Sequence, residues 1–101
     1  MSKYGAVKTV IDGITFASGK EGRRYSELKL MQRAGLISAL ECHPEYPIIV
    51  SGVKVSKYIG DFRYAENGVS VLEDVKGVQT PIFRLKAKLI KALYGVEIRI
   101  T

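Results

Sequence analysis

The sequence predicts an α/β domain in which two helices flank a mixed β-sheet. Two segments with helical periodicity, residues 18–34 and 80–94, enclose a stretch of strand-like patterns, and one alternating pattern follows at residues 96–100. The order is therefore helix, three or four strands, helix, strand. Because 101 residues are too few for a second hydrophobic core, we expect residues 1–101 to form one domain.

The composition limits the classes of partner and compartment. A formal net charge of +6 favours a polyanionic partner, either nucleic acid or an acidic membrane surface. The one cysteine, Cys42, excludes an internal disulfide and argues against an oxidising compartment. The first residues do not lead into the apolar segment of a signal peptide, and no apolar run is long enough to span a bilayer. We therefore expect a cytoplasmic protein that does not enter the membrane.

The first helix follows a short mixed segment. Residues 1–17 are expected to form an N-terminal arm with a turn at Asp12-Gly13. Ser18 can cap the helix, with Glu21 at the spacing of a capping box, and Gly35 stands where helices commonly end. Steps of about 100° place one stripe of side chains along this helix. The stripe consists of Ala17, Glu21, Tyr25, Leu28, Met31 and Gln32.

Strand-like patterns fill the middle of the chain. Asn67-Gly68 separates two of them, and this pair is the strongest short-range signal for a β-hairpin because both residues accept the positive φ of a type I′ turn. A two-residue loop at that point pairs Glu66 with Val69 and sets the register of both strands. The strands are expected at residues 36–42, 48–50, 58–64 and 69–76.

The second helix has clear signals at both ends. Thr80 can act as its N-cap and Pro81 suits its first position, whereas Gly95 ends it after Tyr94. Its expected apolar face consists of Ile82, Leu85, Leu89, Ile90 and Leu93. Residues 96–100 then alternate between apolar and polar side chains, as a half-buried closing strand does.

The hairpin register brings charged side chains together. Asp61 is expected directly opposite Asp74, and Lys76 shares the face of Asp74, opposite Ile59. Carboxylates directly opposite each other on a sheet repel, and a divalent cation such as Mg²⁺ that binds both relieves the repulsion. Lys76 is then placed to hold an attacking water or to neutralise developing charge. In the alternative interpretation one aspartate is solvated and Lys76 forms an ordinary surface ion pair.

Each helix adds a charged side chain that has two interpretations. Glu21 lies on the apolar stripe, so it is either a further metal ligand or the reciprocal partner in the capping box. Lys86 lies within the apolar arc of the second helix and either extends to solvent or contacts phosphate at the rim of the acidic cleft. Cys42 and His43 are not expected to bind a metal as a pair, since adjacent strand residues point to opposite faces. We expect His43 to be structural or exposed.

These residues resemble the PD-(D/E)xK nuclease superfamily, and in particular a family of short phage and prophage proteins of unknown function. The resemblance covers residues 18–101, and the matching stretches are residues 18–25, 61–64, 73–77 and 80–95. It implies a restriction-endonuclease-like α-β-β-β-α-β core. It also implies a catalytic site in which Glu21, Asp61 and Asp74 bind Mg²⁺, or Mn²⁺ as a substitute, beside Lys76. A bulge in the strand would let Glu73 take the place of Asp74.

The resemblance further implies a metal-dependent endonuclease. Its substrate would be branched or recombination-intermediate DNA, as for Holliday junction resolvases, in the cytoplasm of a bacterial host cell. It implies a homodimer, because two nicks need two sites. DNA contacts are expected at Lys86, Lys88, Arg23, Arg24 and Thr80. Two rival hypotheses belong to other classes: a non-catalytic nucleic-acid-binding module that retains the nuclease fold, and a basic interaction protein without a nucleic-acid role.

Overall fold

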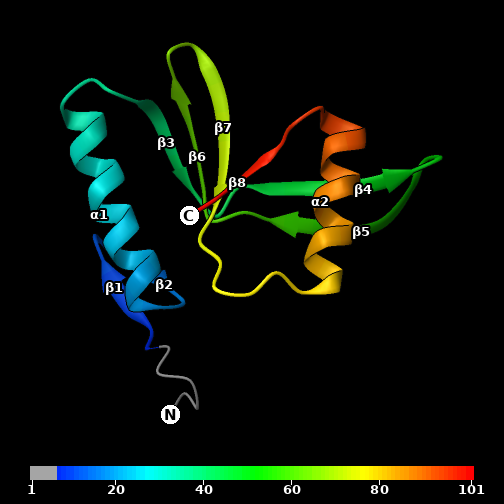
Figure 1. Cartoon of the computed structure of the whole chain (residues 1–101), viewed down its shortest axis with the longest axis horizontal. Helices are drawn as coiled ribbons and strands as arrows, with labels where there is room; N and C mark the ends of the chain where they lie inside the picture. Colours follow the sequence, from blue (N-terminus) through cyan, green and yellow to red (C-terminus); the bar gives the residue numbers. More distant parts are fainter. Residues whose placement is uncertain (1–6) are drawn as a thin grey trace.

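A four-stranded mixed sheet lies at the centre of the protein in a computed structural model, which describes residues 7–101 (Figure 1). Its strands are β3 (Ser38–Cys42), β6 (Phe62–Glu66), β7 (Val69–Asp74) and β8 (Ile98–Ile100), in the spatial order β3-β6-β7-β8. β6 runs antiparallel to both of its neighbours, whereas β8 runs parallel to β7. The predicted α/β class with a mixed sheet is confirmed.

Two helices flank this sheet and begin at the predicted caps. α1 (Gly19–Arg33) follows Ser18, whose Oγ accepts the Glu21 N–H at 3.2 Å. α2 (Pro81–Tyr94) follows Thr80, whose Oγ1 accepts the Phe83 N–H at 3.1 Å. Each cap satisfies a backbone N–H that the first turn of a helix leaves without an intrahelical partner. In the described part of the chain, neither helix has the length and apolar character needed to cross a membrane.

Side chains of β7 alternate between two hydrophobic cores, one on each face of the sheet. Val71 belongs to the core under α1, whose buried members are Phe16, Tyr25, Leu28, Ile37, Phe62, Tyr64 and Val71. Leu72 belongs to the core beside α2, whose buried members are Tyr46, Ile48, Tyr58, Leu72, Phe83 and Ile90. The predicted apolar face of α2 is wrong at Ile82, Leu85 and Leu93, which are exposed, because the helix directs Phe83 and Ile90 to the core.

The N-terminal segment contains a β-hairpin. β1 (Thr9–Ile11) and β2 (Ile14–Phe16) pair across the predicted turn at Asp12-Gly13, where both residues have positive φ. The hairpin packs on α1 so closely that a Cβ at Gly22 would lie 3.1 Å from the Thr9 methyl carbon. The expectation of an arm over residues 1–17 is therefore wrong for residues 9–16, and residues 1–6 lie outside the described residues.

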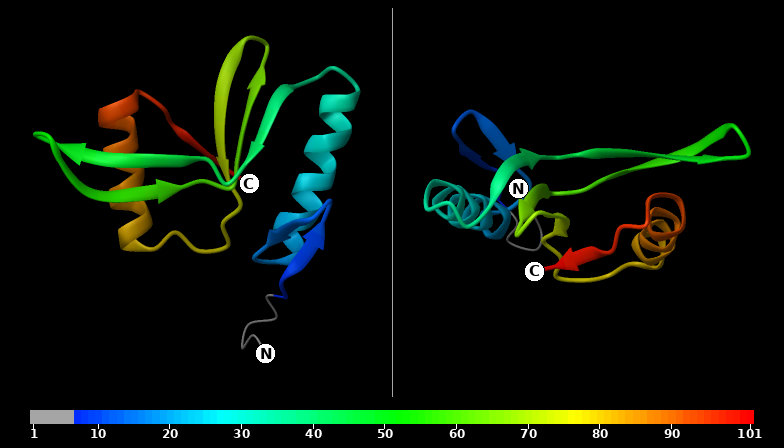
Figure 2. Two further views of the ribbon diagram at one scale, coloured as in Figure 1. Left: turned by 180° about the vertical axis from the view of Figure 1, so that it is seen from behind. Right: turned by 90° about the horizontal axis from the view of Figure 1, so that it is seen from above.

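A second hairpin, β4 (Glu45–Val50) and β5 (Val53–Ile59), leaves the sheet between β3 and β6 and passes over α2 (Figure 1, Figure 2). The expected single strand at residues 58–64 is wrong, because the chain bends at Gly60 and Asp61 before β6 begins. Gly60 permits this bend, since a Cβ there would lie 2.7 Å from Leu72 Cδ1. The expected strand at 48–50 is the end of β4.

The predicted register of β6 with β7 is confirmed in every pair of the ladder, and Asn67-Gly68 forms the turn with two positive φ values. β7 ends at Asp74, so Lys76 lies beyond the strand, where its N–H donates to Thr101 O at 3.2 Å. The expectation that Lys76 lies opposite Ile59 is therefore wrong. β3 and β8 each begin two residues later than expected. Without the two extra hairpins, the element order is the predicted α-β-β-β-α-β.

Candidate metal centre

Two members of the predicted acidic site, which consists of Glu21, Asp61 and Asp74, meet where the β6–β7 ladder ends. Asp74 is the last residue of β7, and Asp61 lies in the bend before β6, where its N–H donates to Glu73 O at 3.2 Å. The Asp61 carboxyl accepts the Val75 N–H at 2.7 Å and hydrogen-bonds the Asp74 carboxyl. The predicted pair is therefore present, although Asp61 reaches it from a bend and not from a strand.

The pKa of the Asp61 carboxyl is strongly raised. Burial and the hydrogen bond to Asp74 raise the pKa of Asp61 to about 8, and the negative charges of Asp74 and Glu21 contribute. Tyr58 reaches the same place from β5: its hydroxyl donates to Asp74 Oδ2, and burial together with this bond raises the pKa of Tyr58. At neutral pH a proton therefore neutralises part of the charge that the acidic site would otherwise carry.

Lys76 lies beside Asp74, as predicted. Its Nζ is 3.3 Å from Asp74 Oδ1 and 4.6 Å from the centre of the Phe83 ring, so the ring covers one side of the ammonium group. The side chain is 30% exposed, and it lines a pocket beside α2. Backbone hydrogen bonds from Thr101 to Asp74 and from Lys76 to Thr101 hold this segment in place after the strand has ended.

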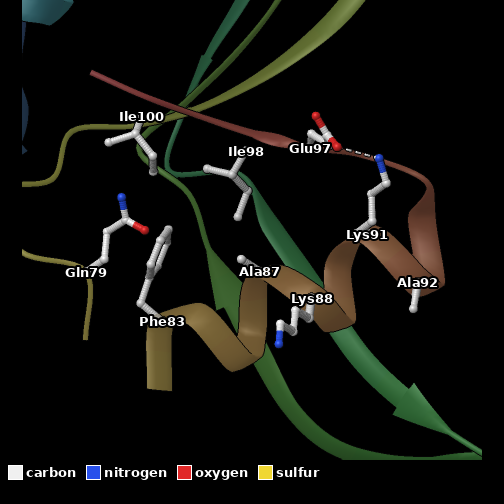
Figure 3. Close-up of a pocket in the computed structure, with 9 residues that line it drawn as sticks. All are labelled: Gln79, Phe83, Ala87, Lys88, Lys91, Ala92, Glu97, Ile98 and Ile100. Carbon is white, nitrogen blue, oxygen red and sulfur yellow. Dashed lines mark hydrogen bonds and ion pairs between the residues drawn. The ribbon is translucent and has the colours of Figure 1, made fainter. Parts of the chain in front are cut away.

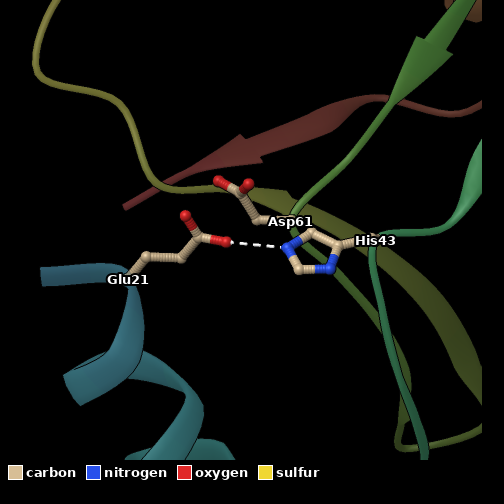
Figure 4. A group of neighbouring side chains, drawn as sticks. All are labelled: Glu21, His43 and Asp61. Carbon is tan, nitrogen blue, oxygen red and sulfur yellow. Dashed lines mark hydrogen bonds and ion pairs between the residues drawn. The ribbon is translucent and has the colours of Figure 1, made fainter. Parts of the chain in front are cut away.

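Glu21 approaches the aspartates from the first turn of α1 and is 5% exposed. Its Oε2 accepts the Ala17 N–H at 3.2 Å, so the reciprocal bond of the helix cap goes to Ala17 and not to Ser18 as in a capping box. The other oxygen, Oε1, lies 3.0 Å from His43 Nε2 (Figure 4). Glu21 therefore takes part in the cap and also faces the rest of the acidic site.

His43 is a site residue that sequence reasoning missed. Ligand atoms of Glu21, His43 and Asp61 all lie within 4.8 Å of one another, a spacing that suits a metal ion (Figure 4). The backbone N–H of His43 donates to Asp61 O at 2.9 Å, which joins the turn after β3 to the bend before β6. No local pattern could have revealed this position, because the partners of His43 lie on other elements of the fold.

Glu73 faces the other side of the sheet, so the alternative in which it replaces Asp74 is wrong. Its buried carboxylate accepts two bonds from Arg24, at 2.7 and 2.9 Å, and one each from the hydroxyls of Tyr64 and Thr101. Burial alone would raise the pKa of Glu73, but these donors outweigh burial and lower it. The expected role of Arg24 as a DNA contact is corrected, because its guanidinium group is already bound to Glu73.

Three other predicted DNA contacts line two separate pockets. Arg23 is exposed on α1 and lines, with Lys20, a pocket of about 240 Å³. Lys86 lines a pocket of about 460 Å³ together with Lys76 and Thr80, and its Nζ donates to a backbone carbonyl of β5 at 3.1 Å. The Thr80 hydroxyl oxygen accepts the capping bond of α2, and its O–H can still donate to a ligand.

Lys88 lies apart from these residues, at a third pocket between α2 and β8 (Figure 3). This pocket has a volume of about 410 Å³, and Ala87, Ile98 and Ile100 are among its apolar lining residues. The acidic residues of the candidate site do not line it. Lys88 and Lys86 therefore face different parts of the surface, although the sequence grouped them.

The donor set fits a divalent cation. Glu21 and Asp61 supply carboxylate oxygens, which hard divalent cations prefer, and His43 adds an imidazole nitrogen. The Asp74 carboxyl adjoins that of Asp61. Among the described residues, Lys76 is the one lysine or arginine that forms an ion pair with these carboxylates. A cation at this point would relieve the repulsion that contributes to the raised pKa of Asp61. The acidic site with His43 is therefore our candidate metal centre.

Comparison with known proteins identifies a family but no activity. Over residues 1–101 the sequence matches the family model described as "Protein of unknown function (DUF1064)". No curated protein and no solved structure matches the chain. The family description names no substrate, cofactor or partner, so the geometry of the candidate metal centre must support any functional conclusion. Because the match spans the sequence, the chain belongs to the DUF1064 family.

Proposed function

We propose that the protein is a metal-dependent endonuclease that hydrolyses phosphodiester bonds of DNA, with branched or recombination-intermediate DNA as its substrate class. The proposal rests on the position of Asp61. Its carboxyl lies between the Glu21–His43 pair on one side and the Asp74–Lys76 pair on the other. A carboxylate-bound divalent cation with an ammonium group beside it is suited to the hydrolysis of a phosphodiester.

The side chains of the candidate metal centre have distinct roles in this proposal. Glu21, Asp61 and Asp74 would hold Mg²⁺ or Mn²⁺, which lowers the pKa of a bound water and neutralises charge on the phosphate. Lys76 Nζ, oriented by Asp74 and covered on one side by Phe83, donates to the attacking water or to a phosphate oxygen as negative charge develops. Burial of Asp74 strengthens these interactions, because bulk water screens them less.

Basic side chains at two pockets support DNA as the substrate. Lys20 and Arg23 line a pocket at α1, whereas Lys57 and Lys86 line the pocket of β5 and α2 that also contains Lys76. Such charges attract the phosphate backbone of nucleic acid without reading its sequence. We therefore propose phosphate contacts by Arg23 and Lys86, and the net charge of +6 agrees with this role.

We also propose that the protein acts as a homodimer in the cytoplasm of a bacterial cell. Cutting both strands of a branched junction requires two catalytic sites. Ile82 and Leu85 of α2 and Val53 and Val55 of β5 are between 58% and 68% exposed, and a second copy of the chain would cover such apolar side chains. Sedimentation analysis tests this part of the proposal, and a monomer at all accessible concentrations would contradict it.

A cleavage panel tests the activity. Branched, linear and circular DNA are incubated with the protein in Mg²⁺ or Mn²⁺, and we expect cleavage of branched DNA. Lys76→Ala should retain metal and DNA binding but lose cleavage by a factor of about a hundred or more, the loss typical of one preorganised electrostatic group. Lys91→Ala is the control, because Lys91 pairs with Glu97 on the exposed surface.

Two results would overturn parts of this proposal. Cleavage of DNA by Lys76→Ala at the wild-type rate would remove Lys76 from the chemical step and refute the proposed active site, although the cleavage activity would remain. Alternatively, the wild type could bind DNA in a salt-sensitive manner and cut none of the substrates with either cation. The second result would favour the non-catalytic nucleic-acid-binding module.

A further inference from the structure

We propose that His43 is a direct metal ligand and that it makes the candidate metal centre select a first-row transition dication over Mg²⁺. This inference deepens the proposed function and rests on it for the presence of a metal ion. The carboxylates of the acidic site leave the identity of the cation open, because carboxylate oxygens bind Mg²⁺ and transition dications alike. The imidazole of His43 is the one group in the site that distinguishes between them.

The distances between the donor atoms suit shared coordination. His43 Nε2 lies 3.0 Å from Glu21 Oε1, and the ligand atoms of Glu21, His43 and Asp61 lie within 4.8 Å of one another. Two ligands that each lie about 2.1 Å from a metal, at right angles, are about 3.0 Å apart. A cation can therefore occupy this space after small side-chain shifts.

The backbone holds His43 in the position that a ligand needs. Its φ of 54° is uncommon for a residue other than glycine, and such conformations persist where the surrounding structure enforces them. Two backbone hydrogen bonds enforce this conformation of His43. His43 N–H donates to Asp61 O at 2.9 Å, and Gly60 N–H donates to Pro44 O at 3.0 Å. Phe16 also packs against the imidazole, with 5.9 Å between the ring centroids. A plain surface ion pair requires none of these constraints.

The chemistry of the imidazole decides which cation binds more tightly. Mg²⁺ requires a nearly ideal octahedral shell of oxygen atoms and loses its water ligands reluctantly, so a nitrogen ligand adds little to its binding. Transition dications accept imidazole readily, and their affinity for a mixed nitrogen and oxygen site rises from Mn²⁺ through Fe²⁺ to Co²⁺. One imidazole among three carboxylates should therefore widen the gap in affinity between Co²⁺ and Mg²⁺.

Calorimetric titration of protein without a polyhistidine tag tests this selectivity with Mg²⁺, Mn²⁺ and Co²⁺ as probes. His43→Asn removes the imidazole nitrogen, and asparagine tolerates the positive φ at this position. Ser51→Asn is the matched control, because Ser51 has a φ of 50° at the far tip of the β4–β5 hairpin. We expect affinity to rise from Mg²⁺ to Co²⁺ in the wild type. His43→Asn should lose about tenfold or more in Co²⁺ affinity and change little for Mg²⁺.

Pulsed electron paramagnetic resonance of the Mn²⁺-loaded protein identifies the ligand directly. The chain contains one histidine, so hyperfine coupling to a bound imidazole nitrogen must come from His43. We expect this coupling in the wild type and in Ser51→Asn, and its loss in His43→Asn. The inference is overturned if the wild type binds cations without nitrogen coupling and His43→Asn binds Co²⁺ as tightly as the wild type does. That result would leave the proposed nuclease activity intact. If the wild type binds no divalent cation, both proposals fail.

Discussion

Asp61→Asn should stabilise the metal-free protein at neutral pH and remove most of its pH dependence. The pKa of the Asp61 carboxyl is raised to about 8 by burial and by the hydrogen bond to Asp74. An asparagine amide has the same shape, and its oxygen can accept the Val75 N–H while its NH₂ group donates to the Asp74 carboxylate. The variant therefore retains both hydrogen bonds without having to take up a proton.

The size of the effect follows from that proton. The ordinary pKa of the Asp61 carboxyl is 3.8, so between about pH 4 and pH 8 the folded protein binds a proton that the unfolded chain releases. The free energy of unfolding of the wild type therefore falls as pH rises through this range. One proton corresponds to about 1.4 kcal/mol per pH unit, or about 2.7 kcal/mol between pH 5 and pH 7. Because Asp61 is only partly buried, we expect about half of that value.

Urea unfolding at pH 5, 6 and 7 in the presence of a chelator measures this difference. The wild type should lose stability across the series, whereas Asp61→Asn should stay nearly constant. Glu97→Gln provides the control, since Glu97 is exposed and pairs with Lys91 away from the acidic site, so its pH series should follow the wild type. A wild-type stability that stays constant or increases between pH 5 and pH 7 would refute the raised pKa of Asp61. An unchanged slope in Asp61→Asn would refute it as well.

Two further predictions concern the basic side chains. Arg24→Ala leaves the buried Glu73 carboxylate without its cation and should lower the free energy of unfolding by about 3 kcal/mol, measured by urea unfolding. Arg33→Ala at the other end of α1 is its control, and equal losses in both variants would contradict the importance of the buried pair. Lys86→Ala should reduce the salt dependence of DNA binding, measured by fluorescence anisotropy, by about one ion. Lys88→Ala should reduce this salt dependence less, because Lys88 faces a different pocket. Identical salt dependences in the wild type, Lys86→Ala and Lys88→Ala would place the DNA on another surface.

The features that neighbouring residues determine were predictable from the sequence. The caps at Ser18 and Thr80 each depend on a side chain and a backbone N–H three residues apart. The hairpin at Asn67-Gly68 depends on two residues that accept positive φ, and its register in turn predicted that Asp61 and Asp74 lie together. Each of these features is decided within a few residues, where propensity and turn geometry act.

The features that depend on distant contacts were not predictable in this way. The segment at residues 58–64 has the alternation of one strand, and only Gly60 within it signalled a break, because glycine in a strand often marks a bend or a close approach. The Glu21–His43 contact and the Arg24–Glu73 ion pair join α1 to segments far away in the chain. Periodicity reports which face of an element is buried, but it does not report which polar group lies across from another.

The candidate metal centre draws its ligands from four separate stretches of the chain, and this dispersion determines how a cation would affect folding kinetics. The β6–β7 hairpin forms through local contacts, whereas α1 and the turn after β3 must dock against it before the ligands meet. A transition state that contains the hairpin but not the docked helix lacks a complete site. A cation that binds only the native state would then slow unfolding and leave the folding rate nearly unchanged, which stopped-flow measurements with and without chelator can distinguish. The lifetime of the folded protein would therefore depend on the concentration of free divalent cation around it.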